Sequence, residues 1–405
     1  MLIDPSDRFV FLPLLYELAV GDADVDEVAP RFEELLGDDV KFNQVEHIKG
    51  RASNVEFGNR TVMVETVDPS GDSTLTPITY DYLIIASGLL PPPSPVPLPS
   101  PPSTYPLLKN SVVPFGTLPS ALLLRRKVSQ LQSLDRPVSA IVVGGGYSGI
   151  ELATNLQSVF TTPAHKAHVK LVQRGSDILP QSSSTFNKSA ARKALSSRGV
   201  TVVTDTVIES VDFSPSTLSV KLSSNSNTTT EADLIVYTYA SSSSTSPVPH
   251  PYGSIVDDSI NKIPTDPALR VIDLTQNRTY RNVFSIGDCT SVQTFTGKPT
   301  AQTAMGMAEV AAFNVYSDMG GGKVMKFKHI DLGEMLTLGT DEATISSLND
   351  NIKISGGVAS FLRRAVYSVR QPTGGQRVRS GLLAGGKGVE KIKERKINKG
   401  GKGGE

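Results

Sequence analysis

Cysteine is nearly absent from this sequence of 405 residues, in which Cys289 stands alone. A single cysteine excludes an intramolecular disulfide framework and a cysteine-based metal site, and we expect no metal. The 40 Lys and Arg residues balance 40 Asp and Glu residues, so net charge predicts no nucleic-acid partner. No apolar run approaches the roughly 18 residues of a membrane span, and Met1 leads directly into the strand-like MLID without a targeting segment. These absences predict a soluble protein.

Strand and helix patterns are both present, in a chain long enough for about two to three domains. TVMVETV and YDYLIIAS predict strands, the second fully buried because its apolar run is continuous, and residues 26–37 predict a helix. The proline-rich residues 89–106 and the serine-rich residues 241–253 predict surface loops or flexible spacers. The Gly- and Lys-rich tail after Lys387 is expected to be disordered.

A βαβ pattern occupies the middle of the chain. Residues 138–143 predict a strand, residues 148–160 a helix, and residues 168–173 the next strand. This alternation predicts an α/β fold. Further strands are expected at residues 200–205, 217–223, 232–239 and 282–288, and a long helix at about residues 300–317.

The segment IVVGGGYSGIE carries three glycines, Gly144, Gly146 and Gly149, between a buried strand and a helix. In such a loop the first glycine permits the tight turn, the second lets the backbone approach a pyrophosphate, and the third lets helix and strand pack closely. The phosphates then meet the free N–H groups of the helix N-terminus. A buried strand precedes the glycines and a helix follows them, as a dinucleotide-binding loop requires. The segment therefore predicts a dinucleotide site rather than a structural turn.

The end of the following strand bears on which nucleotide is bound. An acidic residue there would grip the ribose 2′-hydroxyl of NAD, but this chain has Gln173 followed by Arg174. Glutamine does not repel a 2′-phosphate and arginine can pair with one, so we expect NADPH to be accepted, alone or alongside NADH. The alternative is that Arg174 is simply solvent-exposed.

A second nucleotide site is indicated by three separated segments. MLID is a strand ending at Asp4, YDYLIIASG ends in the small-residue turn Ser87–Gly88, and NVFSIGD is a buried strand ending at Gly287–Asp288. Together they resemble flavoprotein disulfide reductases, in which an FAD domain is interrupted by an NAD(P)H domain of the same Rossmann-like fold. This organisation accounts for a glycine loop in the middle of the chain.

The motifs DRFVFLPLLYELAVG, GGGYSGIELA, FSIGDC, PTAQTAMGMAEVAAFN and LGEMLTLG, in this order, resemble the type II, or alternative, NAD(P)H dehydrogenases. The chain is most similar to their plant and algal C1-type plastid or mitochondrial members, over residues 1 to about 380. The resemblance implies an FAD-dependent NAD(P)H–quinone oxidoreductase on a peripheral membrane of the plastid or mitochondrion, and it leaves a homodimer open. The implied domains are an FAD domain over residues 1–115 and 256–330, an NAD(P)H domain over 116–255, a C-terminal segment over 331–380, and a disordered basic tail over 381–405.

The resemblance also assigns residues to the flavin. Asp4 matches the acid that binds the adenosine ribose, and the alternative is a turn aspartate at a strand end. Pro13 and Leu14 match the segment beside the isoalloxazine. Asp288 matches the aspartate that binds the ribityl chain, and a helix N-cap is its alternative role.

Glu151 matches a glutamate near the nicotinamide, flavin and quinone. A carboxylate with a raised pKa can relay the protons that quinone reduction consumes, and the alternative is a first-turn glutamate that pairs with the helix dipole. The segment Ala301–Gln302–Thr303 matches the lining of the quinone end of the flavin. The second glutamine common in the family is replaced by Gly306, which weakens the quinone assignment.

Residues 356–372 predict a basic amphipathic helix that binds a membrane surface. Six apolar residues share one face, while Arg363, Arg364 and Arg370 lie away from it. The alternative is that this face packs on the protein's own core. The six residues are Val358, Phe361, Leu362, Ala365, Val366 and Val369.

The first strand, glycine loop and helix of an FAD domain do not precede MLID. We therefore expect an N-terminally truncated chain, exposed strand edges, and weakened FAD binding. Two alternative functions stay open. One is a flavin-dependent oxidoreductase with a non-quinone acceptor, similar to apoptosis-inducing factor, and the other is a non-catalytic NAD(P)H-binding remnant without FAD.

Overall fold

The chain is described by a computed structural model, which covers residues 1–37, 45–89, 94–97, 111–180, 182, 184–213, 218–223, 228–238, 252, 255–257, 259–297, 299–347, 350–372 and 377. It forms two compact units. Unit 1 contains Met1–Asp7, Glu46–Pro93 and Tyr239–Leu332, and unit 2 contains Arg8–Val45, Ser94–Thr238 and Gly333–Glu405. The predicted tail over residues 381–405 lies outside the described residues, as does nearly all of the serine-rich stretch.

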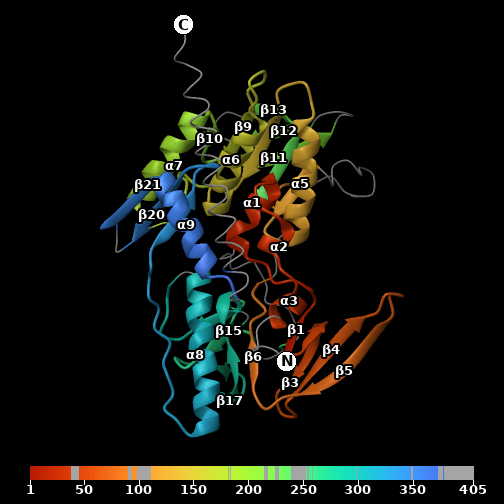
Figure 1. Cartoon of the computed structure of the whole chain (residues 1–405). Helices are drawn as coiled ribbons and strands as arrows, with labels where there is room; N and C mark the ends of the chain where they lie inside the picture. The colour runs from red at the N-terminus through yellow and green to blue at the C-terminus, as the bar shows by residue number, and fades with distance from the viewer. Residues whose placement is uncertain are drawn as a thin grey trace. The chain divides into compact units, whose positions relative to one another are not determined.

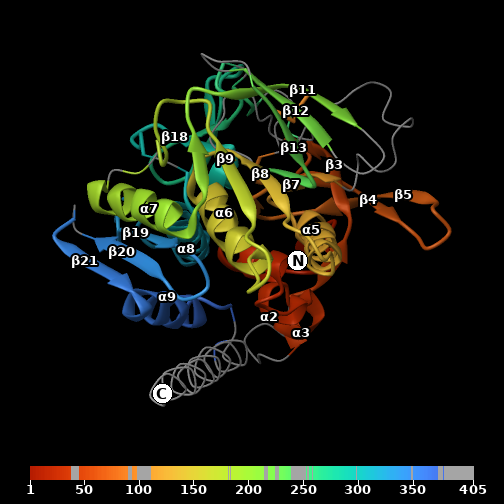
Figure 2. The same cartoon turned by 90° about the horizontal axis from the view of Figure 1, so that it is seen from above.

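Unit 2 is organised around a parallel sheet of five strands in the order β10-β9-β8-β14-β7. Helices α6 and α7 pack against each other beside it (Figure 2). The predicted βαβ unit is confirmed as β8, α6 and β9, within one or two residues at each end. The elements are β7 (Val112–Phe115), α5 (Leu118–Gln132), β8 (Ser139–Val143), α6 (Tyr147–Phe160), β9 (His168–Val172), α7 (Thr185–Arg198), β10 (Thr201–Val203) and β14 (Leu234–Thr238).

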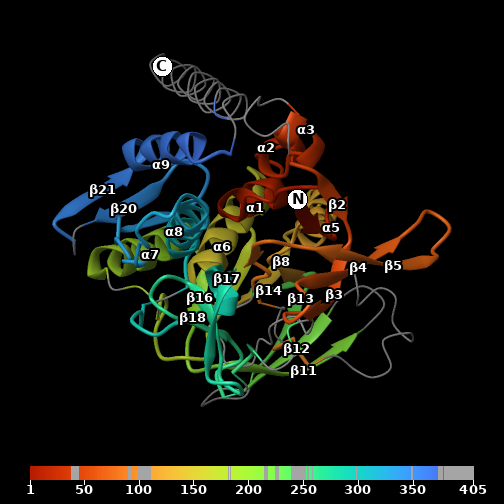
Figure 3. The ribbon, with the colours of Figure 1, turned by 90° about the horizontal axis from the view of Figure 1, so that it is seen from below.

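Two smaller antiparallel sheets complete unit 2, with the orders β11-β12-β13 and β19-β20-β21. Helix α9 lies along β20 and β21, which Figures 1 and 3 show in blue. Their bounds are β11 (Val207–Phe213), β12 (Leu218–Ser223), β13 (Thr228–Ala232), β19 (Glu334–Thr337), β20 (Ala343–Ser347), β21 (Ile352–Gly356) and α9 (Gly357–Val369).

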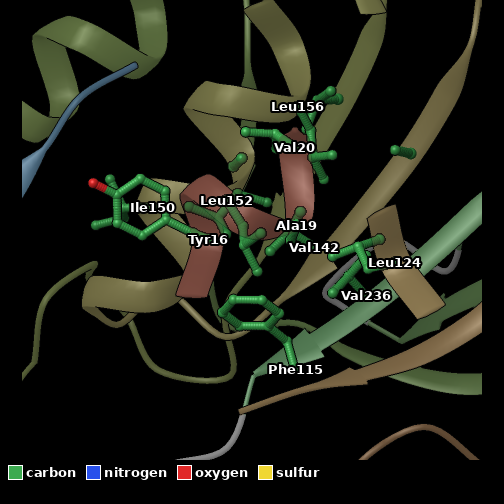
Figure 4. Packing of buried hydrophobic residues seen from close by; sticks show 14 of the residues in the cluster. Tyr16, Ala19, Val20, Phe115, Leu124, Val142, Ile150, Leu152, Leu156 and Val236 are labelled. Carbon is green, nitrogen blue, oxygen red and sulfur yellow. The ribbon is translucent and has the colours of Figure 1, made fainter. Parts of the chain in front are cut away.

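Helix α1, in the N-terminal part of unit 2, packs on α5 and α6. Figure 4 shows Tyr16, Ala19 and Val20 of α1 against Ile150 and Leu152 of α6, inside one apolar cluster of buried residues. The single helix predicted over residues 26–37 is wrong, because Pro30 cannot continue a helix and disfavours helical backbone before it. The observed elements are η1 (Leu12–Leu14), α1 (Leu15–Val20), α2 (Val25–Val28) and α3 (Phe32–Gly37).

Unit 1 contains a five-stranded sheet in the order β18-β15-β16-β17-β6, a three-stranded sheet β3-β4-β5, and the parallel pair β1-β2. Helix α8 packs on the first of these through Met307, Val310 and Ala311. Its bounds and those of the strands are β1 (Leu2–Asp4), β2 (His47–Lys49), β3 (Arg51–Glu56), β4 (Thr61–Val67), β5 (Ser73–Thr79), β6 (Leu83–Ile85), β15 (Ile263–Thr265), β16 (Arg270–Asp273), β17 (Arg278–Ser285), η4 (Gly287–Cys289), β18 (Thr290–Val292) and α8 (Ala301–Gly320).

Strand β6 was expected to be fully buried, and this is wrong. Ile84 is 41% exposed while Ile85 is buried, because β6 is an edge strand that pairs only with β17 among the described residues. β1 likewise pairs only with β2 in the described part of the chain.

Candidate functional site

The glycine loop of unit 2 follows the central strand β8. Gly144 has φ +108 and donates its N–H to the Val172 carbonyl oxygen of β9 at 2.9 Å. A side chain at this position would overlap the Thr238 hydroxyl at the end of β14. Glycine is therefore required both by the backbone conformation and by the close approach of β14.

The other two glycines of the motif have different surroundings. A Cβ at Gly149 would overlap the Gly144 carbonyl oxygen, whereas nothing lies within 4 Å of a Cβ at Gly146. Gly146 is the N-cap of α6 and supplies no side-chain cap, so no side chain at the N-cap satisfies the N–H groups of the first turn. This is the geometry in which a helix N-terminus receives phosphate.

Gln173 is attached to the same loop. Its Oε1 accepts the Gly145 N–H at 2.8 Å, which fixes the carboxamide with its Nε2 on the side of Gly175. The group offered at the end of β9 is thus an N–H donor and not a carboxylate. Arg174 is exposed beside it.

Glu334 of β19 ties the start of α6 to the C-terminal sheet. Its Oε2 accepts hydrogen bonds from the Tyr147 hydroxyl, the Ser182 hydroxyl and, at 3.4 Å, the Asn187 amide. Tyr147 is the first residue of α6. Glu334 thereby anchors the helix end that borders the glycine loop.

Glu151 lies on α6, two residues after Gly149, and its Oε1 accepts the Thr337 N–H at 3.2 Å. The residue as a whole is half-buried. Burial of its carboxyl raises the pKa to about 7, although Arg363 and the Thr337 N–H oppose this and Glu17 adds to it. Glu151 is the fifth residue of α6, beyond the first turn where the helix dipole acts, so the helix-dipole alternative is wrong.

Glu17 of α1 and Arg363 of α9 form a buried ion pair that the sequence patterns did not reveal. Arg363 Nη2 donates to Glu17 Oε1 at 2.7 Å, and the side chains are 1% and 4% exposed. Burial raises the Glu17 pKa, but Arg363 and Arg364 outweigh this and hold it below its usual value. The available signal was a stripe of small and polar residues at helical spacing, Ala359, Ser360 and Ser368, on the side of α9 that carries Arg363.

The predicted orientation of α9 is wrong for Arg363 but right for the apolar face. Val358, Phe361 and Val369 are 65%, 59% and 66% exposed, whereas Arg363 is buried. The alternative in which the apolar face packs on the protein's own core is therefore excluded for these three residues. In the described part of the chain, no helix is both long and apolar enough to cross a bilayer.

In unit 1, the turns that follow β6 and β17 lie at the same edge of the sheet, because the two strands are parallel with Ile85 opposite Ser285. Ser87–Gly88 and Gly287–Asp288 are thus brought together as neighbouring turns. Burial raises the Asp288 pKa, partly offset by Lys262. The N-cap alternative for Asp288 is wrong, since it lies inside η4 and strand β18 follows.

The remaining predicted residues occupy defined local positions. Asp4 accepts the Ser6 N–H at 2.7 Å, so its turn role is present in the structure. Gln302 Oε1 accepts the Leu332 N–H at 3.1 Å. Ala301 and Thr303 are in the first turn of α8, and Pro13 and Leu14 are in η1 of unit 2. Among the described residues, no group of three or more His, Cys, Asp or Glu could hold a metal ion.

Comparisons with known proteins agree with this geometry. A sequence model of the family described as pyridine nucleotide-disulphide oxidoreductase matches residues 1–308. Demethylphylloquinone reductase NdbB of Synechocystis sp. is 31% identical over 387 residues, covering 94% of this chain and 87% of that protein. The alternative NAD(P)H-ubiquinone oxidoreductase C1, chloroplastic/mitochondrial, of Arabidopsis thaliana is 28% identical over 409 residues, covering 94% and 74%.

A solved structure with a similar fold is that of NDH2 from Plasmodium falciparum in complex with NADH. It has a TM-score of 0.71 and 15% sequence identity, and the match covers 94% of this chain and 91% of that one. At this identity the match supports the fold alone.

Proposed function

The chain belongs to the pyridine nucleotide-disulphide oxidoreductase family, and we propose from this premise that it transfers electrons from NAD(P)H to a quinone through FAD, as a type II NAD(P)H–quinone oxidoreductase. This function is the one that the resemblance to type II NAD(P)H dehydrogenases implied. The observation that carries the proposal is the position of Glu151, a buried carboxyl with a pKa near 7 on the helix that begins at the glycine loop. One helix thus joins a nucleotide-binding loop to a group that can hold and release a proton at neutral pH.

The residues present fit the two cofactors. NAD(P)H would be held by the backbone of Gly144–Gly149 and by Gln173, whose orientation is fixed by the Gly145 N–H. FAD would be held by Asp4 at its ribose end, by the turns at Ser87–Gly88 and Gly287, and by Asp288, a half-buried carboxyl suited to accepting bonds from hydroxyls. Bound FAD supplies the chemistry that converts hydride transfer into delivery of two electrons to a quinone.

The protein's own contribution to quinone reduction is a proton. Two electrons turn a quinone into a dianion unless two protons accompany them, so a donor with a pKa near the working pH is effective. Glu151 meets this condition. The assignment of Gln302 to the quinone end of the flavin stays a proposal that rests on the resemblance.

The test is the visible spectrum of the purified full chain after addition of FAD. We expect a bound-flavin band near about 450 nm that NADPH or NADH bleaches and a quinone restores. A colourless protein that still binds NADPH would contradict the proposal and favour a non-catalytic nucleotide-binding role. Reoxidation by a non-quinone acceptor but by no quinone would contradict the quinone assignment.

The identity of residue 173 is expected to control nucleotide choice. Changing Gln173 to Glu keeps the acceptor for the Gly145 N–H but puts a negative charge beside a 2′-phosphate. Like-charge contact costs several kcal/mol, so the ratio of kcat/KM for NADPH over NADH should fall by roughly tenfold or more. Steady-state kinetics with both nucleotides measure this ratio.

The matched control for this change is Thr201→Glu, which adds the same charge at the exposed start of β10. Thr201 pairs with Lys170 in the middle of β9, three residues before Gln173, and not with the strand end that carries Gln173. We expect it to leave the ratio unchanged. An unaltered ratio in Gln173→Glu would contradict the assigned role of residue 173.

We further propose that the exposed face of α9 binds a membrane surface, and that this membrane belongs to a plastid or mitochondrion, as the resemblance implies. Val358, Phe361 and Val369 are exposed on this face, and Arg370 is exposed beside it. Apolar residues flanked by basic ones bind the interface of anionic bilayers. This is also the phase in which lipid-soluble quinones are found.

Replacing Val358 and Phe361 with Ser should abolish flotation with vesicles of phosphatidylcholine and phosphatidylglycerol. These point substitutions are sharper than deletion of residues 356–372, because the deletion also removes the buried Arg363. The matched control replaces Tyr316 and Met319, which are 77% and 73% exposed on α8, with Ser. Equal flotation of the α9 variant and the wild type would reject the membrane role.

A further inference from the structure

Helix α9 inserts a charged side chain into the core of unit 2. The Arg363 side chain is 1% exposed, and its guanidinium lies over the rings of Tyr16 and Tyr367, at 5.7 and 5.1 Å from their centroids. Burial of an ion costs several kcal/mol unless opposite charge and hydrogen bonds compensate for it. The groups that compensate for the Arg363 charge are therefore informative about what this residue does.

The compensation provided by Glu17 alone is incomplete. The single Glu17 carboxylate is shared by two arginines, with Arg363 Nη2 at 2.7 Å from Oε1 and Arg364 Nη2 at 3.0 Å from Oε2. Two positive charges thus meet one negative charge. In the described structure, the buried Nε and Nη1 of Arg363 have no hydrogen-bond partner. A second carboxylate is needed for the cluster to be neutral.

Glu151 is the carboxyl available for this purpose, and a short chain of contacts leads to it. The Tyr16 hydroxyl contacts Glu17 Oε1 at 3.1 Å and the Thr337 hydroxyl at 2.7 Å. The Thr337 N–H in turn donates to Glu151 Oε1 at 3.2 Å. The contacts involve α1, α6, β19 and α9, all within unit 2.

We propose that Arg363 is a positioning residue that supplies the counter-charge for the Glu151 carboxylate and so sets the pH at which Glu151 releases its proton. The inference rests on the proposed function, in which that proton goes to the quinone. Release leaves the cluster with two arginines and two carboxylates, hence neutral. Uptake of a proton from water restores the starting state, and no electron transfer is involved within the cluster.

The charged and titratable groups around Glu151 act in opposite directions. Burial and the Glu17 charge favour the protonated form, while Arg363 and the Thr337 N–H favour the carboxylate. The neighbouring phenols stay neutral, because burial raises the pKa of Tyr367 to about 12 and that of Tyr16 well above its usual value. Arg363 is therefore the arginine whose charge favours the Glu151 carboxylate, while Arg364 pairs with Glu17.

The experiment is an infrared titration of the carboxyl C=O band of Glu151 in the purified full chain, with the band identified by its loss in Glu151→Gln. A nearby opposite charge shifts a carboxyl pKa by about one to three units, and Arg363 lowers the pKa of Glu151. Arg363→Gln should raise the midpoint by at least about one unit. Glu17→Gln should lower it, and Arg363→Lys, which keeps the charge, should stay near the wild type.

Opposite shifts in the two charge-removing variants distinguish an electrostatic role from a structural one, because lost packing would not shift the midpoint in opposite directions. If Arg363→Gln fails to fold, the downward shift in Glu17→Gln remains the test. Equal midpoints in the wild type and the folded variants would overturn the inference. The titration needs neither nucleotide, flavin nor quinone, so a failure of the proposed function would show separately, as absent quinone reduction in the wild type.

Discussion

Gly149→Ala is expected to destabilise unit 2 by about 3 kcal/mol and to remove detectable NAD(P)H binding. A Cβ at this position would overlap the Gly144 carbonyl oxygen. Neither partner can yield easily, because Gly144 is itself held between the Val172 carbonyl and Thr238. Relief of the overlap must move α6 away from β8 and displace the helix N-terminus from the loop.

The measurements are urea unfolding and titration of NADPH by fluorescence. Gly146→Ala is the matched control, since it adds the same methyl group to the same loop where nothing lies within 4 Å. It should fold with wild-type stability. If the NADPH phosphates approach the backbone at Gly146, the added methyl group should nevertheless weaken NADPH binding by the Gly146→Ala variant. A Gly149→Ala chain with unchanged stability would show that the helix-packing role assigned to this glycine is incorrect.

The βαβ unit was predictable because its information is local. A continuous apolar strand, three spaced glycines and an apolar helix each follow from neighbouring residues, and the predicted bounds of β8, α6 and β9 hold within about two residues. The helix predicted over residues 26–37 failed for an equally local reason. The apolar spacing over these residues fits one helix, but Pro30 cannot continue a helix and separates α2 from α3.

The buried face of α9 was not predictable in the same way. Apolar periodicity correctly located the face that carries Val358 and Phe361, but whether such a face points inward or outward depends on what the opposite face meets. Arg363 faces inward because it pairs there with the carboxylate of Glu17, which is 346 positions away in the chain. No local pattern encodes a contact at that separation, so the cluster around Glu151 emerged only from the structure.

The same limitation applies to Glu151. The sequence placed it two residues after the glycine loop, and resemblance gave it a role in proton transfer. Burial and the Glu17 charge raise its pKa, whereas Arg363 and the Thr337 N–H lower it, and these residues come from both ends of the chain. The second-turn position of Glu151 was hidden as well, because the helix was expected to begin at residue 148 and the observed first residue is Tyr147.

Glu151→Gln should make the chain more stable at pH 8 and much less active. The folded-state pKa of about 7 lies above the ordinary value of 4.5. The folded form therefore binds this proton more tightly than the unfolded form, and stability falls as the pH rises from about 4.5 through about 7. At about 1.4 kcal/mol per unit of pKa, ionised Glu151 costs the folded state about 3 kcal/mol at pH 8, and glutamine removes that cost.

Urea unfolding of the two proteins at pH 5 and pH 8 tests this directly. The gain of Glu151→Gln over the wild type should be about 1 kcal/mol or less at pH 5 and largest at pH 8. Glu17 titrates with the opposite sign, since its pKa is lowered, but it is present in both proteins and largely cancels in the difference. A gain that is the same at both pH values would mean that Glu151 carries no raised pKa in the folded chain.

The loss of activity should appear in one half-reaction only. A glutamine cannot donate a proton, so reoxidation of the reduced flavin by a quinone should slow by about 10²- to 10⁴-fold, whereas flavin reduction by NADPH should keep its rate. Stopped-flow measurements resolve the two steps. A residue that lowers stability by about 3 kcal/mol at pH 8 and speeds one proton-coupled step is retained for function, because packing alone would favour the glutamine. Equal slowing of both steps would instead indicate that Glu151 acts on nucleotide binding.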